Sequence, residues 1–242
     1  MAVKKVNVDN QSFEINYEII NPKNRKDLII LHGWGSNKEL MSRAFSNIAT
    51  DFRHIYIDMP GFGKSSNDYI LDSQGYSKVL EQFLKYLGAN KDIIIGHSFG
   101  GKIATLLKPK LLVLLSNSGI VTQKPLSIRL KIKLFKVLKS LGGGALFGLF
   151  ASKDVKGMSE NMYESFKKIV DEDFSEIFAS YSGKTLIFWG KEDRATPLSS
   201  GEKVTQLIKN SKFYPLIGDH YFFLNHAIFI QKAIERELNG EF

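Results

Sequence analysis

The sequence contains no cysteine among its 242 residues. This absence excludes disulfide bonds, thiolate nucleophiles and cysteine-ligated zinc. Histidine is also scarce, and the five residues of this type are His32, His54, His97, His220 and His226. They form neither an HxH nor an HxxxH cluster, so a histidine-based metal site has little support. We expect neither a metal nor another cofactor.

Long apolar runs are missing as well. No run approaches the 18 residues of a membrane span, and the first residues, MAVKKVNVDNQ, lack the apolar centre of a signal peptide. These features predict a cytoplasmic protein without a transmembrane segment. Hydrophobic residues make up 43% and charged residues 24% of the chain, which is ordinary for a globular protein. The length fits one large domain, or a core domain with an insertion.

Basic residues outnumber acidic ones by 33 to 25, which gives a net charge of +8. Such a surplus suits nucleic acid, an anionic membrane or an acidic partner, although a solvated surface is the commoner reason. The sequence shows no recognition motif and no interleaving of basic with aromatic residues. We therefore expect that the protein does not bind nucleic acid.

A strand–helix rhythm organises most of the chain. Residues 3–19 alternate in hydrophobicity and predict two strands joined by a turn. The later apolar runs do not alternate, which is typical of parallel strands covered on both faces. Strands are expected at 27–32, 54–59, 92–96, 111–116, 185–190 and 212–217, and helices at 37–50, 73–87, directly after residue 98, at 199–209 and at 225–238.

This rhythm stops at about Asn117 and resumes at Thr185. The residues between, 120–183, contain helix-like segments and no convincing strand. We interpret them as a helical insertion that lies over the sheet, with a core formed by residues 1–119 and 184–242.

The most informative motif is Gly96-His97-Ser98-Phe99-Gly100, which has the form G-x-S-x-G. A bare match of this kind is weak evidence. Here, however, a buried strand runs into the motif and a helix-compatible run follows. That is the context of a nucleophile elbow, in which a tight turn projects the serine hydroxyl from the carboxyl end of a strand. The motif predicts that Ser98 is a nucleophile, against the alternative of an incidental serine in a glycine-rich turn.

A serine hydroxyl needs a base to remove its proton, and that base is usually a histidine oriented by a carboxylate. In this kind of fold the order along the chain is serine, acid, histidine. His220 and His226 both follow Ser98. His220 is preferred because it follows a predicted strand on a loop, whereas His226 falls in or at the start of the last helix.

The preferred acid is Asp193, which follows a predicted buried strand and lies between Ser98 and His220 in the chain. Glu192 remains an alternative on chemical grounds. Asp219 also remains one, although its position next to His220 in sequence gives it poor geometry for orienting that ring.

Attack on a carbonyl creates an oxyanion that needs hydrogen-bond donors already in place. The elbow offers the backbone N–H of Phe99. A second donor should come from the loop after an earlier strand, and the glycine-containing segment 31–35, LHGWG, has that position. Its His32 precedes Ser98 and so does not fit the order expected of a base.

Five segments together resemble the α/β-hydrolase superfamily, in particular its esterase-like and meta-cleavage-hydrolase-like branch. They are LHGWG at 31–35, DMPGFGKS at 58–65, IGHSFGG at 95–101, FWGKEDRATP at 188–197 and GDHYFFLNH at 218–226. The resemblance implies an α/β-hydrolase fold, with a mostly parallel eight-stranded sheet flanked by helices and a helical lid at 120–183. It also implies a catalytic triad of Ser98, Asp193 and His220, with the backbone amides of Trp34 and Phe99 as the oxyanion hole.

The serine at the elbow separates this chain from haloalkane dehalogenases and epoxide hydrolases, which resemble the fold but carry aspartate there. We expect a carboxylesterase-like enzyme that cleaves a small-molecule ester with an apolar acyl part. Two other enzymatic activities are alternatives: hydrolysis of a C–C bond in dienoates of the 2-hydroxy-6-oxo type, and hydrolysis of an acyl-carrier-linked (thio)ester. A remoter alternative is a non-catalytic binding protein on the same fold. The triad does not separate the first three, because substrate choice depends on the lid.

Residues 124–139 predict a basic amphipathic helix within the insertion. Leucine and valine recur at helical spacing, and no acidic residue interrupts six basic ones: Lys124, Arg129, Lys131, Lys133, Lys136 and Lys139. The simplest interpretation is a lid helix whose basic face lies in water. An acidic partner, such as an acyl carrier protein, or an anionic interface is the alternative.

Overall fold

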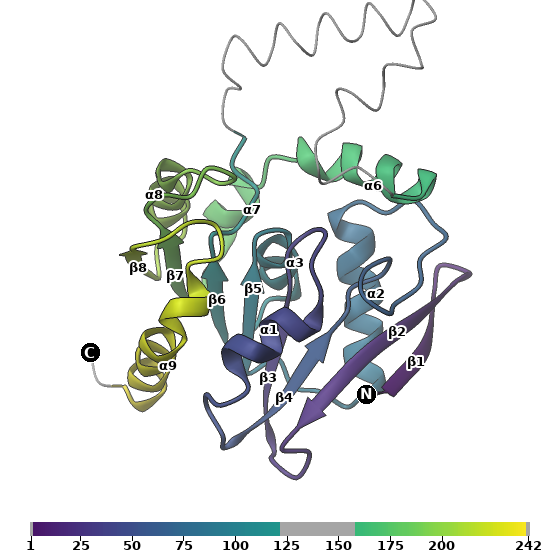
Figure 1. Ribbon diagram of the computed structural model, residues 1–242, viewed down its shortest axis with the longest axis horizontal. Helices are drawn as coiled ribbons and strands as arrows, with labels where there is room; N and C mark the ends of the chain where they lie inside the picture. The colour runs from purple at the N-terminus through teal and green to yellow at the C-terminus, as the bar shows by residue number, and fades with distance from the viewer. Residues whose placement is uncertain (1, 122–157, 241–242) are drawn as a thin grey trace, which may run out of the picture.

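The structure is a computed structural model that describes residues 2–121 and 158–240. Within these ranges eight strands form one sheet in the order β1-β2-β4-β3-β5-β6-β7-β8 (Figure 1). The strands are β1 (Ala2–Val8), β2 (Gln11–Ile20), β3 (Lys26–Leu31), β4 (Phe52–Ile57), β5 (Ile93–His97), β6 (Leu111–Leu115), β7 (Lys184–Gly190) and β8 (Ser211–Leu216). Strand β2 runs antiparallel to both β1 and β4, and every later pairing is parallel. The predicted mostly parallel sheet of eight strands is confirmed.

Helices cover both faces of the sheet (Figure 1). The first face packs against α2 (Ser73–Tyr86), α3 (Phe99–Leu107) and α8 (Leu198–Leu207). The second face packs against α1 (Lys38–Phe45) and α9 (Phe223–Asn239). Burial on both faces explains why β5 begins with three isoleucines and β6 consists of leucine and valine alone, with no polar alternation. None of the helices in the described ranges is long and apolar enough to cross a membrane.

The predicted helix at 37–50 is shorter than expected. Asn37 caps α1 by accepting a hydrogen bond from the Leu40 N–H at 3.1 Å, but the helix ends at Phe45. Ala49 then adopts a positive φ of 41°, which a helix does not allow, and the Phe52 N–H bonds back to its carbonyl. The chain thereby turns into β4 two residues earlier than the sequence suggested.

The predicted insertion is described only in part. Two helices, α6 (Glu160–Val170) and α7 (Ser175–Ser180), lie between residues 158 and 183, and no strand occurs in that stretch. Helix α6 lies above the sheet, at the end where β5, β6 and β7 finish (Figure 1). The predicted basic helix at 124–139, with its six lysine and arginine residues, falls outside the described residues.

A buried ion pair stabilises the loop that follows β4. The Lys38 ammonium lies 2.7 Å from Asp58 Oδ2, and neither side chain is exposed to solvent. The same carboxylate accepts the Lys38 N–H at 2.8 Å and the Lys64 N–H at 3.1 Å. Gly63 is required beside it, because a Cβ there would lie within 2.4 Å of the carboxylate oxygens. The DMPGFGKS segment thus folds around a buried charge.

Replacing Lys38 should therefore be costly. We expect Lys38→Met to lower the free energy of unfolding by about 3–5 kcal/mol, because Asp58 would remain buried without its counter-ion. Lys78→Met is the matched control, since Lys78 pairs with Asp9 on the surface and such pairs contribute at most about 1 kcal/mol. Chemical denaturation of both variants measures the difference, and equal losses would contradict this account.

Candidate functional site

Ser98 occupies a strained turn between β5 and α3. Its backbone has φ 50° and ψ −115°, a region that side-chain-bearing residues seldom adopt. Glycine on each side makes the turn possible. A Cβ on Gly96 would lie 2.5 Å from the Gly100 carbonyl oxygen, and a Cβ on Gly100 would lie 2.5 Å from the His32 carbonyl oxygen. The elbow geometry expected from G-x-S-x-G is present, and the Ser98 side chain is partly exposed at its apex.

The structure brings His220 and Asp193 into direct contact, although they lie 27 residues apart. His220 Nδ1 is 2.8 Å from Asp193 Oδ2. The Asp193 side chain is fully buried, whereas the His220 side chain is 17% exposed. The aspartate follows β7 and the histidine follows β8, so their meeting depends on the pairing of these two parallel strands.

Asp193 is held as a carboxylate by several donors. Its Oδ1 accepts the backbone N–H groups of Ala195 at 2.8 Å and of Thr196 at 2.9 Å, and the Thr196 hydroxyl lies 2.9 Å from Oδ2. Burial alone would raise the pKa of Asp193. The hydrogen bond and charge of His220, together with the Thr196 N–H, outweigh burial and lower that pKa below its usual value. The aspartate is therefore negatively charged and faces the imidazole.

The alternative acids and base have other partners. Glu192 accepts a short hydrogen bond from the Gly218 N–H, and Asp219 accepts one from the Tyr221 N–H at 2.8 Å. His226 lies in α9, where its Nε2 is 2.8 Å from the Ile217 carbonyl oxygen. His32 is buried, with Nδ1 bonded to the Gly33 carbonyl and Nε2 accepting the Met59 N–H. Each of these side chains has a local structural bond.

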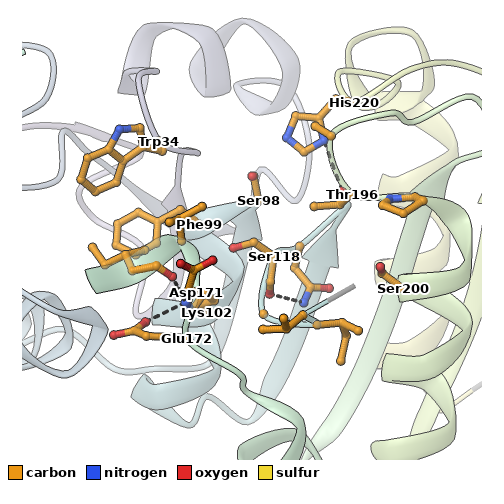
Figure 2. A pocket seen from close by; sticks show the side chains of 18 of the residues that line it. Trp34, Ser98, Phe99, Lys102, Ser118, Asp171, Glu172, Thr196, Ser200 and His220 are labelled. Atoms are coloured by element: carbon orange, nitrogen blue, oxygen red, sulfur yellow. Dashed lines mark hydrogen bonds and ion pairs between the residues drawn. The ribbon is translucent and has the colours of Figure 1, made fainter. Parts of the chain in front are cut away.

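A cavity of about 410 Å³ opens beside the elbow, and its volume is in the range of sites for small molecules. Ser98 and His220 face it from different loops (Figure 2), and the predicted amide donors Trp34 and Phe99 also line it. Gly33 brings the Trp34 loop close to the elbow, since a Cβ on Gly33 would lie 3.1 Å from Ser98 Cβ. Ser98, His220, Trp34 and Phe99 thus all border one cavity. Asp193 does not line it, but contacts His220, which does.

One wall of the cavity is aromatic. The Trp34 ring lies 5.4 Å from both the Phe99 and the Phe166 ring centroids, and 4.8 Å from that of Phe62. Among the described residues, no group of three or more histidine, aspartate or glutamate side chains is arranged to hold a metal ion. The arrangement provides a hydroxyl, an imidazole–carboxylate pair and an apolar surface.

Comparisons with known proteins concern the fold and the family. Residues 27–110 match the family described as the alpha/beta hydrolase fold. An uncharacterised hydrolase of Bacillus subtilis, YugF, is 25% identical over 88% of this chain and 89% of its own. The pimeloyl-[acyl-carrier protein] methyl ester esterase of Vibrio parahaemolyticus is 22% identical over 77% of this chain and 83% of its own. The solved esterase EaEST of Exiguobacterium antarcticum superposes with a TM-score of 0.73 at 22% identity, covering 94% of this chain and 96% of that one.

Residues 27–110 thus resemble the alpha/beta hydrolase family, and the described residues have the α/β-hydrolase fold, an eight-stranded sheet with helices on both faces.

The contact between His97 and the loop of His220 was not predicted from the sequence. His97 directly precedes Ser98 and is buried, and its Nε2 lies 3.0 Å from the His220 carbonyl oxygen. The two imidazole rings are 4.6 Å apart, centroid to centroid. Burial lowers the pKa of His97 to about 3, so the ring is neutral and its Nε2–H donates to that carbonyl. His97 therefore links the elbow to the loop of His220. Its position inside G-x-S-x-G was the only signal in the sequence.

Several buried histidines of this protein make stability sensitive to acid. Burial lowers the pKa of His32 to about 4 and also lowers that of His54. As pH falls below about 6.5, these histidines bind protons in the unfolded chain, whereas the same histidines stay neutral in the folded protein. The stabilisation is complete above that pH and is lost as pH falls towards the folded pKa values.

We therefore expect His97→Gln to weaken the pH dependence of stability. The glutamine amide can still donate to the His220 carbonyl, but one proton fewer is bound on unfolding. Between pH 6 and pH 5 the wild type should lose about 1.2 kcal/mol more than the variant, because the unfolded histidine binds most of one extra proton over this range. Urea unfolding at the two pH values measures this, and parallel losses would show that His97 is protonated in the folded protein.

Proposed function

We propose that this protein is a serine hydrolase that cleaves carboxylic esters of small molecules with an apolar acyl part. The observation that carries the proposal is the 2.8 Å contact between His220 and the buried Asp193, on the cavity that also holds Ser98 at a strained turn. The esterases among the relatives support the same reaction class.

In the proposed mechanism Ser98 attacks the ester carbonyl while His220 takes its proton. Asp193 holds the imidazole in one tautomer, with the proton on Nδ1, and stabilises the imidazolium that forms. The backbone N–H groups of Trp34 and Phe99 bind the oxyanion of the tetrahedral intermediate. His220 then protonates the leaving alcohol, and water enters to hydrolyse the acyl-enzyme by the same steps.

The elements around the cavity suit an apolar acyl group. Trp34, Phe99 and Phe166 line it with aromatic carbon, and Ile169 and Val170 of α6 add aliphatic surface. We propose that residues 120–183 are a lid on the core of 1–119 and 184–242, since α6 and α7 already border the carboxyl edge of the sheet.

A narrower candidate is an ester carried by an acyl carrier protein. A relative is named as a pimeloyl-[acyl-carrier protein] methyl ester esterase, and the segment 124–139 has six basic residues that suit an acidic carrier. Hydrolysis of p-nitrophenyl esters of graded chain length, beside a carrier-bound methyl ester and a panel of dienoates, separates these substrates. Turnover of the dienoates alone would replace the ester proposal by C–C hydrolysis.

Ser98→Ala should leave the fold intact and lower kcat by at least about 10³-fold, because no acyl-enzyme can form. His220→Ala should be comparably severe, whereas His226→Ala should keep kcat within about threefold, since His226 only bonds a local carbonyl. A fluorophosphonate probe should label the wild type and not Ser98→Ala. A severe His226→Ala variant would move the base to His226, and an unlabelled wild type would favour a binding protein.

Asp193→Asn should lower kcat by about 10³- to 10⁴-fold with little loss of folding, because the amide neither fixes the tautomer nor stabilises the imidazolium. Glu192→Gln is the neighbouring control, and it should keep kcat within about threefold because the Glu192 carboxylate accepts the backbone N–H of Gly218 and glutamine can do the same. Steady-state kinetics of both variants provide the test. Full activity in Asp193→Asn would remove this residue from the mechanism.

A further inference from the structure

An ion pair lines the cavity on the far side of Ser98 from His220 (Figure 2). Lys102 lies in α3, four residues after Ser98, and only 1% of its side chain is exposed. Its ammonium is 2.7 Å from Glu172 Oε2. Both side chains line the same cavity as Ser98 and lie together below it in Figure 2. The mechanism proposed above uses neither of them.

The donors of Lys102 are all directed at protein groups. Besides Glu172, the ammonium donates to the Ile169 carbonyl oxygen at 2.9 Å and lies 4.4 Å from the centroid of the Phe174 ring. An ammonium has three N–H groups, so two hydrogen bonds and one cation–π contact occupy them. Burial lowers the pKa of Lys102, while Glu172 opposes that shift.

Glu172 is held from its other side by α2. Its Oε1 accepts the Ser73 N–H at 3.1 Å, and its Oε2 accepts a short hydrogen bond from the Ser73 hydroxyl. The side chain is 24% exposed, which is the part that reaches the cavity. A carboxylate is an acceptor only, so a second carboxylate at this end would meet a negative charge and no spare donor on Lys102.

The direction of catalysis places the acyl group at this end. His220 must protonate the leaving alcohol, so the alcohol lies on the His220 side of Ser98. The acyl tail then extends the other way, past Phe99 towards Lys102 and Glu172 (Figure 2).

We propose that the Lys102–Glu172 ion pair forms the floor of the acyl pocket and restricts the enzyme to esters whose acyl tails are uncharged. This inference rests on the proposed esterase function and names its substrate class. A neutral tail leaves the pair intact. A tail that ends in a carboxylate either faces Glu172 or must displace it from Lys102, and burying an unpaired charge is expensive.

The test compares two esters with the same six-carbon acyl chain, p-nitrophenyl hexanoate and mono-p-nitrophenyl adipate. For the wild type, kcat/KM should be at least about 30-fold higher for the hexanoate. For diacid half-esters of four to eight carbons, kcat/KM should fall below that of the uncharged ester of equal length once the chain is long enough to reach the Lys102–Glu172 pair. Equal kcat/KM for hexanoate and adipate in the wild type would overturn the proposal without any variant.

Glu172→Gln should narrow that ratio by at least about tenfold, because the Lys102 charge becomes available to the adipate carboxylate. The glutamine oxygen can still accept from Ser73. Glu164→Gln is the matched control: Glu164 lies on α6 and pairs with Lys167 on the surface, so the ratio should not change. An unchanged ratio in Glu172→Gln would overturn the proposal.

The double variant Lys102→Met with Glu172→Leu separates charge from volume. Replacing both partners of a buried pair by apolar residues is often tolerated, so we expect a folded protein. It should hydrolyse the hexanoate and still discriminate against the adipate, because an apolar floor offers the carboxylate no partner. A gain in adipate hydrolysis equal to that of Glu172→Gln would mean that space, not charge, sets the preference.

Failure of this inference differs from failure of the esterase proposal. If the protein is not an esterase, the hexanoate is not hydrolysed and the fluorophosphonate does not label Ser98. If only the acyl-floor assignment is wrong, the hexanoate is hydrolysed and the label attaches to Ser98. In that case the hexanoate-to-adipate ratio of kcat/KM is the same in the wild type and in Glu172→Gln.

Discussion

The turn at Ser98 requires three stretches of backbone to lie closer together than side chains would allow. Gly96 packs on the Gly100 carbonyl, and Gly100 packs on the carbonyl of His32 from the loop after β3. The Ser98 N–H also bonds the Leu115 carbonyl of β6, and its own carbonyl accepts the Ser118 N–H. The strained backbone at Ser98 is therefore held by the two strands on either side of β5. The cavity, the loop of Trp34 and the Ser98 side chain all take their positions from this one close approach.

Three pairs of ionisable side chains near the site each join two segments of the chain. Lys38 and Asp58 stabilise the loop after β4, Asp193 and His220 join the loops after β7 and β8, and Lys102 and Glu172 tie the end of α6 to α3. Because a buried charge without its partner is costly, each pair also fixes where its loop lies.

Much of the architecture could be predicted because its signals are local. Apolar runs without alternation indicated the parallel strands, and the spacing of G-x-S-x-G between such a run and a helix indicated the elbow. The order serine, acid, histidine removed His32, and positions directly after predicted strands favoured Asp193 and His220. The contact of Asp193 with His220 is compatible with that choice. The end of α1 at Phe45 was not predictable, because Ile48 and Ala49 continue the helical spacing of the apolar residues before them, although the chain turns at Ala49.

The amino-acid sequence by itself determined the class of fold, the strained turn and the chemistry of the residues available at the strand ends. Backbone conformation and strand burial depend on neighbours in the chain, so they leave a readable pattern. Only the tertiary structure decided that His97 bonds the loop of His220, that Thr196 supports Asp193, and that Lys102 meets Glu172 beneath the elbow. Those contacts join residues that lie far apart in the chain and are brought together by strand pairing and helix packing. The sequence around a single lysine or threonine does not show which distant atom its side chain will contact.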